Sequence, residues 1–138
     1  MNIAIIGAGY VGLVTSVCLA HIGHHVVCVD NNKDKVKRLR AGHIPIYEPG
    51  LEEILKECVR KKRLAFTDSI KDAGKKAPVI FIAVGTPSKA NGDADLTHVE
   101  NVAREIAGVM TSYKLIVEKS TVPAETGKKI ERTIKLNL

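Results

Sequence analysis

Three glycines near the start of the chain constrain its fold more than any other feature. Gly7, Gly9 and Gly12 follow the apolar run NIAII and open a segment of helical character, in the spacing G-x-G-x-x-G. This spacing allows a tight turn at Gly7, close approach of the backbone to a bound group at Gly9, and close packing of a helix on a strand at Gly12. Amide groups at the start of such a helix favour an anion. The segment is therefore predicted to form a strand, a phosphate-binding turn and a helix.

A second apolar run, HVVCVD, ends in Asp30, about twenty residues beyond the glycines. In a dinucleotide-binding fold, an acid at this position accepts hydrogen bonds from the hydroxyls of the adenosine ribose. A 2′-phosphate would be repelled there, so the pattern favours NAD over NADP, although Lys33 and Lys35 would weaken that rejection. The competing interpretation is structural: the glycines permit a turn only, and Asp30 caps the next helix.

Short β-branched runs alternate with segments of helical period along the chain. Four runs are predicted to form strands, at residues 2–7, 25–30, 78–84 and 114–120. Their nearly continuous apolar character is typical of strands that are covered on both faces. The alternation predicts an α/β fold with a doubly wound, mostly parallel, Rossmann-like sheet. At 138 residues, the chain is expected to form a single domain.

The polar loop GTPSKANGDADL follows the strand predicted at 78–84. In a doubly wound sheet the first strand has a neighbour on each side, and this later strand crosses to the far side. The loop is then expected beside the glycine turn, where Gly85 allows close approach, Pro87 fixes the path and Thr86 offers a hydroxyl to a ribose or phosphate. An ordinary surface connection is the alternative, since Gly, Pro, Asn and Asp are common in turns.

Helix starts are predicted from local signals. Thr97 and Glu100 have the spacing of a capping box, and Asp68 is placed to cap a short helix. Pro123 is expected in the first turn of the last helix. In the preceding segment EKSTVP, Ser120 and Thr121 are expected on the rim of the crevice that lies between the carboxyl ends of the strands. They would lie near the nicotinamide end of a bound NAD. Each of these two hydroxyls could serve the site or cap the following helix, and the sequence leaves both roles open.

Composition limits the kinds of molecule that the chain is expected to bind. The formal net charge of +6 suggests an anionic binding partner. The basic segments KVKRLR and RKKR have acidic neighbours and no interleaved aromatic residues to stack bases, so a phosphorylated small molecule is favoured over nucleic acid. The three cysteines form no C-x-x-C pair, which predicts neither a metal site nor a disulfide framework and indicates an intracellular protein. The nearly uncharged residues 3–20 are interpreted as strand and helix, not as a membrane segment.

Taken together, these motifs resemble the NAD-binding domain of the UDP-glucose/GDP-mannose dehydrogenase family. The matching segments span nearly the whole chain and are GAGYVGLVTSVCLA, VDNNKDKV, IPIYEPGLEE, VGTPS, ADL and EKSTVP. The IYEPGL wording is closer to the UDP-glucose branch than to the GDP-mannose branch. Glu48, Pro49 and Gly50 within it match a family signature without an evident physical role.

The resemblance implies oxidation of the C6 alcohol of a UDP-sugar to a carboxylate, by two hydride transfers to two NAD molecules. It implies cofactor contacts from the glycine turn, the second strand and the two later loops, namely Gly7, Gly9, Tyr10, Val11, Gly12, Asp30, Lys35, Val84, Gly85, Thr86, Pro87 and Thr121. Thr121 is also expected close to the chemistry, where its hydroxyl would help to hold a water or the reacting oxygen of the sugar.

The family's cysteine nucleophile and its neighbouring lysine, asparagine and acid are expected outside these residues, because Cys18, Cys28 and Cys58 do not match that motif. Residues 1–138 are thus expected to be the cofactor-binding half of a longer enzyme. The resemblance implies that this enzyme is cytoplasmic and takes part in polysaccharide biosynthesis. It also implies a homodimer or higher oligomer that binds a UDP-sugar through another domain. Alone, the chain is expected to bind NAD weakly and to catalyse nothing. The alternatives are a dehydrogenase of a UDP-N-acetylhexosamine or of GDP-mannose, and a stand-alone NAD-sensing module.

Overall fold

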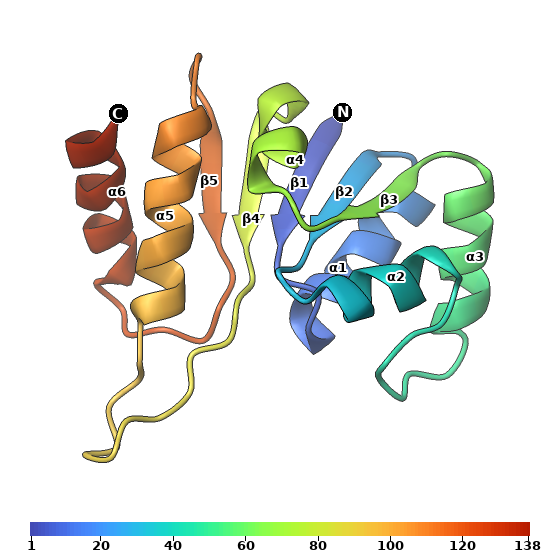
Figure 1. Ribbon diagram of the computed structural model, residues 1–138, viewed down its shortest axis with the longest axis horizontal. Coiled ribbons are helices and arrows are strands. Elements are labelled where there is room, and N and C mark those ends of the chain that lie inside the picture. The colour runs from blue at the N-terminus through green and yellow to red at the C-terminus, as the bar shows by residue number, and fades with distance from the viewer.

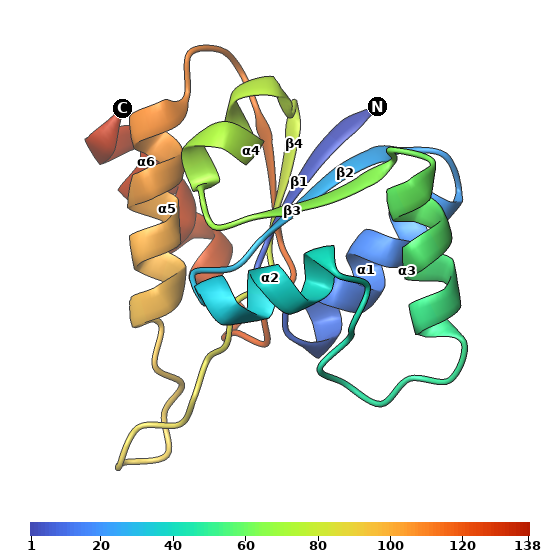
Figure 2. The ribbon, with the colours of Figure 1, turned by 45° about the vertical axis from the view of Figure 1, so that its right-hand side comes forward.

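A central sheet of five parallel strands carries three helices on each face (Figures 1 and 2). The computed structural model describes all residues, 1–138. The strands are β1 (Asn2–Ile6), β2 (His25–Val29), β3 (Leu64–Thr67), β4 (Val79–Ile82) and β5 (Leu115–Glu118). The helices are α1 (Tyr10–His21), α2 (Lys33–Arg40), α3 (Leu51–Arg60), α4 (Ile70–Lys76), α5 (Thr97–Val109) and α6 (Thr126–Asn137).

The strand order is β3-β2-β1-β4-β5, which confirms the doubly wound sheet predicted from the sequence. At the end of β1, Ile6 pairs with Val29 of β2 on one side and with Ile82 of β4 on the other. After β3 the chain crosses over β1 and β2 to build the second half of the sheet. Because every pair is parallel, all five strands end at the same edge, and the loops that follow β1, β2 and β4 meet there.

Two apolar cores hold the layers together. One lies between the sheet and α1, α2 and α3, and includes the fully buried Ile5, Leu13 and Leu55. The other lies between the sheet and α4, α5 and α6, and includes Ile80 and Ile106. Both are aliphatic, as the aromatic content of 4% requires. None of the helices combines the length and the apolar composition needed to cross a lipid bilayer.

The structure contains one strand, β3, that was not among the four apolar runs. Its four residues, LAFT, alternate between buried and less buried positions, and Ala65 is exposed. The strand lies at an edge of the sheet, so it lacks the continuous apolar character of its neighbours. Four residues with this pattern are too short a signal to separate from the end of the preceding helix.

Two predicted capping residues and one predicted helix start were wrong. Ser69, not Asp68, caps α4, because its hydroxyl accepts a hydrogen bond from the Asp72 amide at 3.1 Å. Asp95 supports the start of α5 by accepting from the amide and the hydroxyl of Thr97, so Thr97 does not act as a capping box residue. The last helix begins at Thr126, three residues after Pro123, with no side-chain cap. Neither Ser120 nor Thr121 therefore caps that helix.

Candidate nucleotide-binding site

The glycine turn between β1 and α1 is closed by backbone contacts that leave no room for side chains. Gly7 has a φ of +109°, and a Cβ there would lie 2.3 Å from the Ala83 carbonyl oxygen of the β4 end. A Cβ on Gly12 would lie 1.8 Å from the Gly7 carbonyl oxygen. The expected roles of Gly7 in the turn and of Gly12 in helix packing are thus confirmed. At Gly9 a Cβ would meet nothing within 4 Å, so the backbone there faces open space.

Asp30, directly after β2, ties this turn to the next strand. One carboxylate oxygen of Asp30 accepts from the Ala8 amide at 3.0 Å and from the Lys35 Nζ at 3.2 Å. The other accepts from the Asn32 amide at 2.9 Å. The side chain is only 12% exposed. Its carboxylate is therefore held in one orientation at the end of the sheet, within reach of the turn.

Cys28 lies beneath the turn, on β2 and two residues before Asp30. Its thiol is buried and lies 3.8 Å from the Gly7 carbonyl oxygen. Burial raises the pKa of the Cys28 thiol to about 12. The residue therefore packs as a small apolar side chain and is not a nucleophile, in agreement with the sequence analysis.

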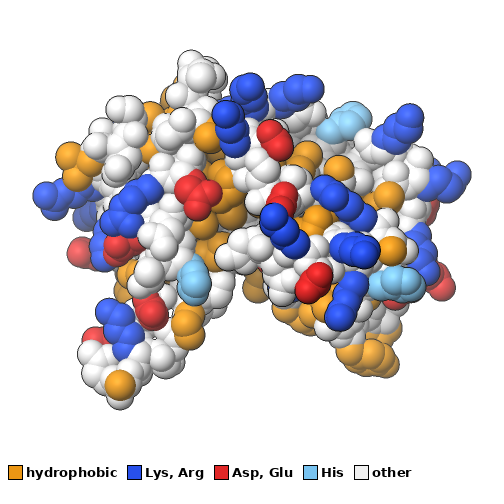
Figure 3. Space-filling model, viewed as in Figure 1, with side chains coloured by type: hydrophobic (Ala, Val, Ile, Leu, Met, Phe, Trp, Pro, Cys, Tyr) orange, Lys and Arg blue, Asp and Glu red, His pale blue; other side chains and the backbone are white.

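A cleft of about 570 Å³ opens at this edge of the sheet. Figure 3 shows the surface hollowed between α5 and the part of the molecule that carries α2. Seven of the sequence-predicted residues line the cleft: Gly7, Gly9, Asp30, Lys35, Val84, Gly85 and Pro87. Five others are not part of its lining: Tyr10, Val11, Gly12, Thr86 and Thr121. The cleft thus brings the turn, the acid after β2 and the loop after β4 into one site.

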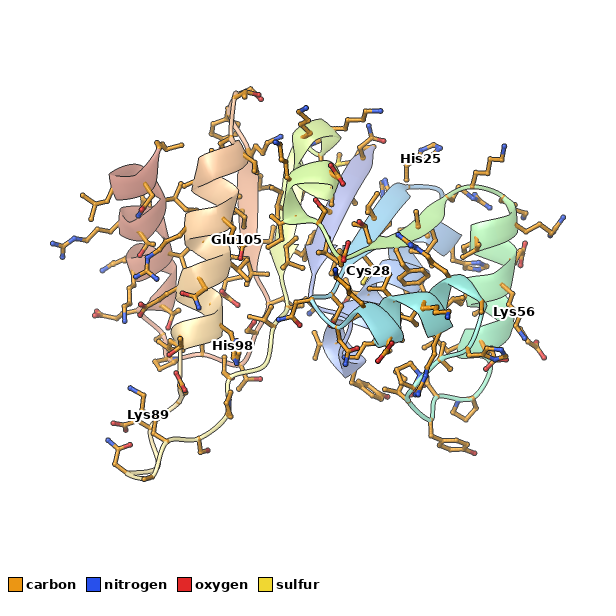
Figure 4. All side chains as sticks on the ribbon, viewed as in Figure 1. His25, Cys28, Lys56, Lys89, His98 and Glu105 are labelled. Atoms are coloured by element: carbon orange, nitrogen blue, oxygen red, sulfur yellow. The ribbon has the colours of Figure 1, made fainter.

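The sequence analysis missed the opposite wall of the cleft. His98, Asn101 and Glu105 of α5 line it, together with Asp68 and Ile70 at the start of α4. His98 and Glu105 both come from the side of α5 that faces the rest of the sheet (Figure 4). The available signal was the polar face of α5 at positions i, i+3 and i+7, which lies beside the apolar stripe that predicted the helix.

The loop after β4 leaves the cleft as a self-supported hairpin, residues 85–96. Ser88 and Ala94 form an antiparallel bridge, and backbone bonds join Lys89 to Asp93 and Pro87 to Asp95. The loop projects well beyond the body of the molecule (Figure 1). Of its residues, only Gly85 and Pro87 line the cleft.

Thr86 is bonded to the loop that follows β5. Its hydroxyl donates to the Thr121 carbonyl oxygen at 2.7 Å. On the other side of Thr121, the Ser120 amide donates to the Ile82 carbonyl oxygen at 3.1 Å and to a carboxylate oxygen of Glu118 at 2.6 Å. The backbone at Ser120 and Thr121 is therefore held by Ile82 of β4, by Glu118 of β5 and by the Thr86 hydroxyl.

Glu118, at the end of β5, is a residue that the sequence analysis did not single out. Burial raises the pKa of its carboxyl group, and one of its oxygens is buried without a hydrogen-bond partner. The other oxygen holds the Ser120 amide. The Glu118 side chain thus fixes the backbone at Ser120, next to Thr121, through this hydrogen bond.

Tyr10, the first residue of α1, gives a physical role to Glu48 of the IYEPGL signature. The Tyr10 hydroxyl donates a hydrogen bond to the Glu48 carboxylate. This bond, with the charge of Glu48, raises the pKa of Tyr10. It joins the connection between α2 and α3 to the start of α1.

The residues present fit a dinucleotide. The amides at the start of α1 and the open space at Gly9 suit a diphosphate, because no side chain blocks approach to the backbone there. The fixed carboxylate of Asp30 at the rim suits a pair of ribose hydroxyls. Val29, Ile70 and Val102 add apolar surface to the cleft. The fold and this site define a Rossmann-type dinucleotide-binding domain.

The comparisons with known proteins identify the family. The sequence profile of the UDP-glucose/GDP-mannose dehydrogenase family, NAD binding domain, matches residues 1–137. The chain therefore belongs to this family and is its NAD-binding domain. A UDP-glucose 6-dehydrogenase of Rhizobium meliloti (strain 1021) is 51% identical over 136 residues, which are 98% of this chain and 31% of the relative. One from Pseudomonas aeruginosa is 47% identical over 138 residues, 100% of this chain and 30% of the relative.

Solved structures of the same family have the same fold. A ternary complex of GDP-mannose dehydrogenase from Pseudomonas aeruginosa is 40% identical, with a TM-score of 0.94 over 99% of this chain and 32% of that one. A UDP-glucose dehydrogenase from Pyrobaculum islandicum is 41% identical, with a TM-score of 0.92 over 98% of this chain and 32% of that one. The chain thus spans less than a third of the length of these relatives.

Proposed function

We propose that this chain supplies the NAD site of an enzyme that oxidises UDP-glucose to UDP-glucuronate. The observation that carries the proposal is the cleft that joins an open glycine turn to the fixed carboxylate of Asp30. The choice of UDP-glucose is supported by the relatives named UDP-glucose 6-dehydrogenase, at 51% and 47% identity. A GDP-mannose dehydrogenase is the competing assignment, since one such structure has a TM-score of 0.94.

In this proposal the residues around the turn bind and orient the cofactor. The turn residues Gly7 to Gly12, including Tyr10 and Val11, present backbone amides to the diphosphate. Asp30 accepts the hydroxyls of the adenosine ribose, and Lys35, already bonded to Asp30, lies at the same end. Residues 84–87 form the wall near the second nucleotide. When bound, NAD would supply the acceptor for hydride from the sugar.

Thr121 is the residue of this chain proposed to lie nearest the chemistry. Its side chain is exposed, while its carbonyl oxygen is held by the Thr86 hydroxyl. The Thr121 hydroxyl would then be free to hold a water or the reacting oxygen of the sugar. Thr86 would act on the reaction by fixing the Thr121 backbone, in addition to its expected contact with the cofactor.

The remaining parts of the reaction are assigned to sequence outside these residues. We expect a central helix that forms a dimer and a second domain that binds the UDP-sugar and supplies the cysteine nucleophile. The whole protein is then a cytoplasmic homodimer or higher oligomer. Residues 1–138 alone would bind NAD without turning over a substrate.

The test is calorimetric titration of this chain with NAD and, separately, with NADP. NAD is expected to bind and NADP to bind much more weakly. Asp30→Ala should weaken NAD binding by about 10- to 100-fold, because charge-assisted hydrogen bonds to the ribose are lost. Asp34→Ala is the matched control, since Asp34 lies one turn along on the exposed side of α2. Equal NAD affinity in the parent chain and in Asp30→Ala would overturn the assignment of Asp30 to the NAD site.

The substrate is tested on the full-length protein. Turnover of UDP-glucose with NAD, without turnover of GDP-mannose or a UDP-N-acetylhexosamine, is the expected result. Faster turnover of either competitor would assign the enzyme to another branch of the family.

A further inference from the structure

The wall of the cleft opposite Asp30 carries polar side chains that no backbone turn requires. His98, Asn101 and Glu105 of α5 line the cleft, and Figure 4 labels the first and the last of them. They stand at positions i, i+3 and i+7, so their side chains follow one another along the helix. Apolar positions between them, such as Val99 and Ala103, are buried in the core instead. This wall therefore presents hydrogen-bonding groups to whatever occupies the cleft.

The hydrogen-bonding capacity of these groups is specific. The Asn101 carbonyl oxygen already accepts from the Arg104 guanidinium at 3.1 Å, so the Asn101 amide nitrogen is left as a donor. Glu105 makes no side-chain hydrogen bond or ion pair in the chain, and an ionised carboxylate only accepts. Asn101 and Glu105 are one helical turn apart. Together they offer a donor and an acceptor side by side.

The position of Asp30 determines what reaches this wall. If Asp30 holds the adenosine ribose, the base extends into the part of the cleft bounded by Ile70, Val102 and α5. Ile70 and Val102 provide apolar surface for the flat faces of a purine. The edge of the base then meets the polar face of α5. Adenine carries an amino donor next to a ring-nitrogen acceptor on its edge.

We propose that Asn101 and Glu105 recognise the amino edge of the adenine ring, so that the cleft selects adenine over a purine with a carbonyl at the same position. The proposal rests on the proposed function, because it takes NAD as the ligand and Asp30 as its ribose site. Glu105 accepts from the exocyclic amino group, and the Asn101 amide donates to the ring nitrogen N7, which is an acceptor in adenine and in hypoxanthine alike. With hypoxanthine, a carbonyl oxygen faces the Glu105 carboxylate, and two acceptors are opposed.

The test compares NAD with nicotinamide hypoxanthine dinucleotide, in which that carbonyl replaces the amino group and the neighbouring ring nitrogen N1 carries a hydrogen. By calorimetry, the parent chain is expected to bind NAD about tenfold more tightly than the hypoxanthine analogue. Glu105→Gln keeps the size of the side chain but gives it an amide that can donate to the carbonyl. In that variant the preference for NAD should fall to about threefold or less. Glu131→Gln is the control for loss of charge, since Glu131 is exposed on α6 outside the cleft.

The outcomes separate this proposal from the proposed function. If the parent binds NAD and the hypoxanthine analogue equally well, adenine selection is overturned while the NAD site stands. If Glu105→Gln keeps the full preference, the role of Glu105 is overturned. Failure of the parent chain to bind NAD at all would overturn both. Loss of preference in Glu105→Gln, with the preference kept in Glu131→Gln, would support the proposal.

Discussion

The two walls of the cleft differ in the groups that form them, which are backbone atoms at one wall and side chains at the other. The wall at the glycine turn is made of backbone, and the turn behind it is packed so closely that a Cβ on Gly12 would overlap the Gly7 carbonyl oxygen. The wall at α5 is made of exposed polar side chains on a regular helix, such as Asn101 and Glu105. A backbone wall cannot change without disturbing the fold, whereas a side-chain wall can. We therefore expect substitutions at the first to reduce stability, and those at the second to alter selectivity.

The largest effect is expected at the backbone wall. Gly12→Ala should lower the free energy of unfolding by about 3 kcal/mol or more, because the new Cβ would lie 1.8 Å from the Gly7 carbonyl oxygen. Backbone, not a flexible side chain, would have to move. Urea denaturation followed by circular dichroism measures the change. A Gly12→Ala chain as stable as the parent would show that the turn is looser than the structure describes.

A smaller effect on the free energy of unfolding, one that depends on pH, is expected from the Cys28 thiol beneath the same turn. In the folded chain the Cys28 thiol has a pKa of about 12, whereas in an unfolded chain it has its ordinary pKa of about 9.0. Stability is therefore unaffected below pH 9 and falls as the pH rises from there toward 12. By pH 10 the contribution should be about 1–2 kcal/mol.

Comparison with Cys28→Ala isolates this thiol from other groups that titrate in the same range. Between pH 7.5 and pH 10, roughly the span over which an ordinary thiol ionises, the parent should lose more stability than the variant. Equal losses, measured by denaturation at both pH values, would mean that the thiol ionises in the folded chain.

At the junction of the two later loops, an effect of about 1 kcal/mol is expected. Thr86→Val removes the hydroxyl that donates to the Thr121 carbonyl oxygen, a bond at the exposed surface. Amide hydrogen exchange should become faster in residues 119–125, with little change in the glycine turn. Thr86→Ser keeps a hydroxyl and should restore protection. Unchanged exchange in Thr86→Val would contradict a role in fixing Thr121.

The smallest effect, of opposite sign, is expected on α5. Gly108 is exposed near the end of the helix, and a Cβ there would meet nothing within 4 Å. Gly108→Ala should raise the free energy of unfolding by about 0.5 kcal/mol, since alanine restricts the unfolded chain more than glycine. The same denaturation experiment as for Gly12→Ala measures it. A loss of stability here would mean that α5 tolerates change no better than the turn does.

The same contrast explains how far the sequence predicted the structure. The glycine turn and Asp30 were predictable because their geometry depends on local spacing, and a few residue types satisfy it. The sheet order followed from the alternation of strand and helix, since parallel connections allow few arrangements. The short edge strand β3 was missed because its pattern covers only four residues. The Ser69 cap and the support of α5 by Asp95 were missed because several neighbouring polar residues can make such bonds.

The missed parts of the site depend on tertiary contacts. The polar face of α5 looks like an ordinary solvated surface until the fold brings it opposite Asp30. The bonds of Thr86 to Thr121 and of Tyr10 to Glu48 join residues 35 and 38 positions apart. Neither partner carries a local signal for the other. The buried carboxyl group of Glu118 was likewise visible only when its surroundings were known.

The bond between Asp30 and the Ala8 amide has a consequence for how cofactor preference can evolve in this chain. Asp30 lines the cleft, and one of its carboxylate oxygens also holds the backbone of the glycine turn. A mutation of Asp30 that admitted a 2′-phosphate would also leave the Ala8 amide without its partner. Selection for NADP would therefore act against selection for a folded turn, and the two could be reconciled only by a second change that supplies the lost acceptor.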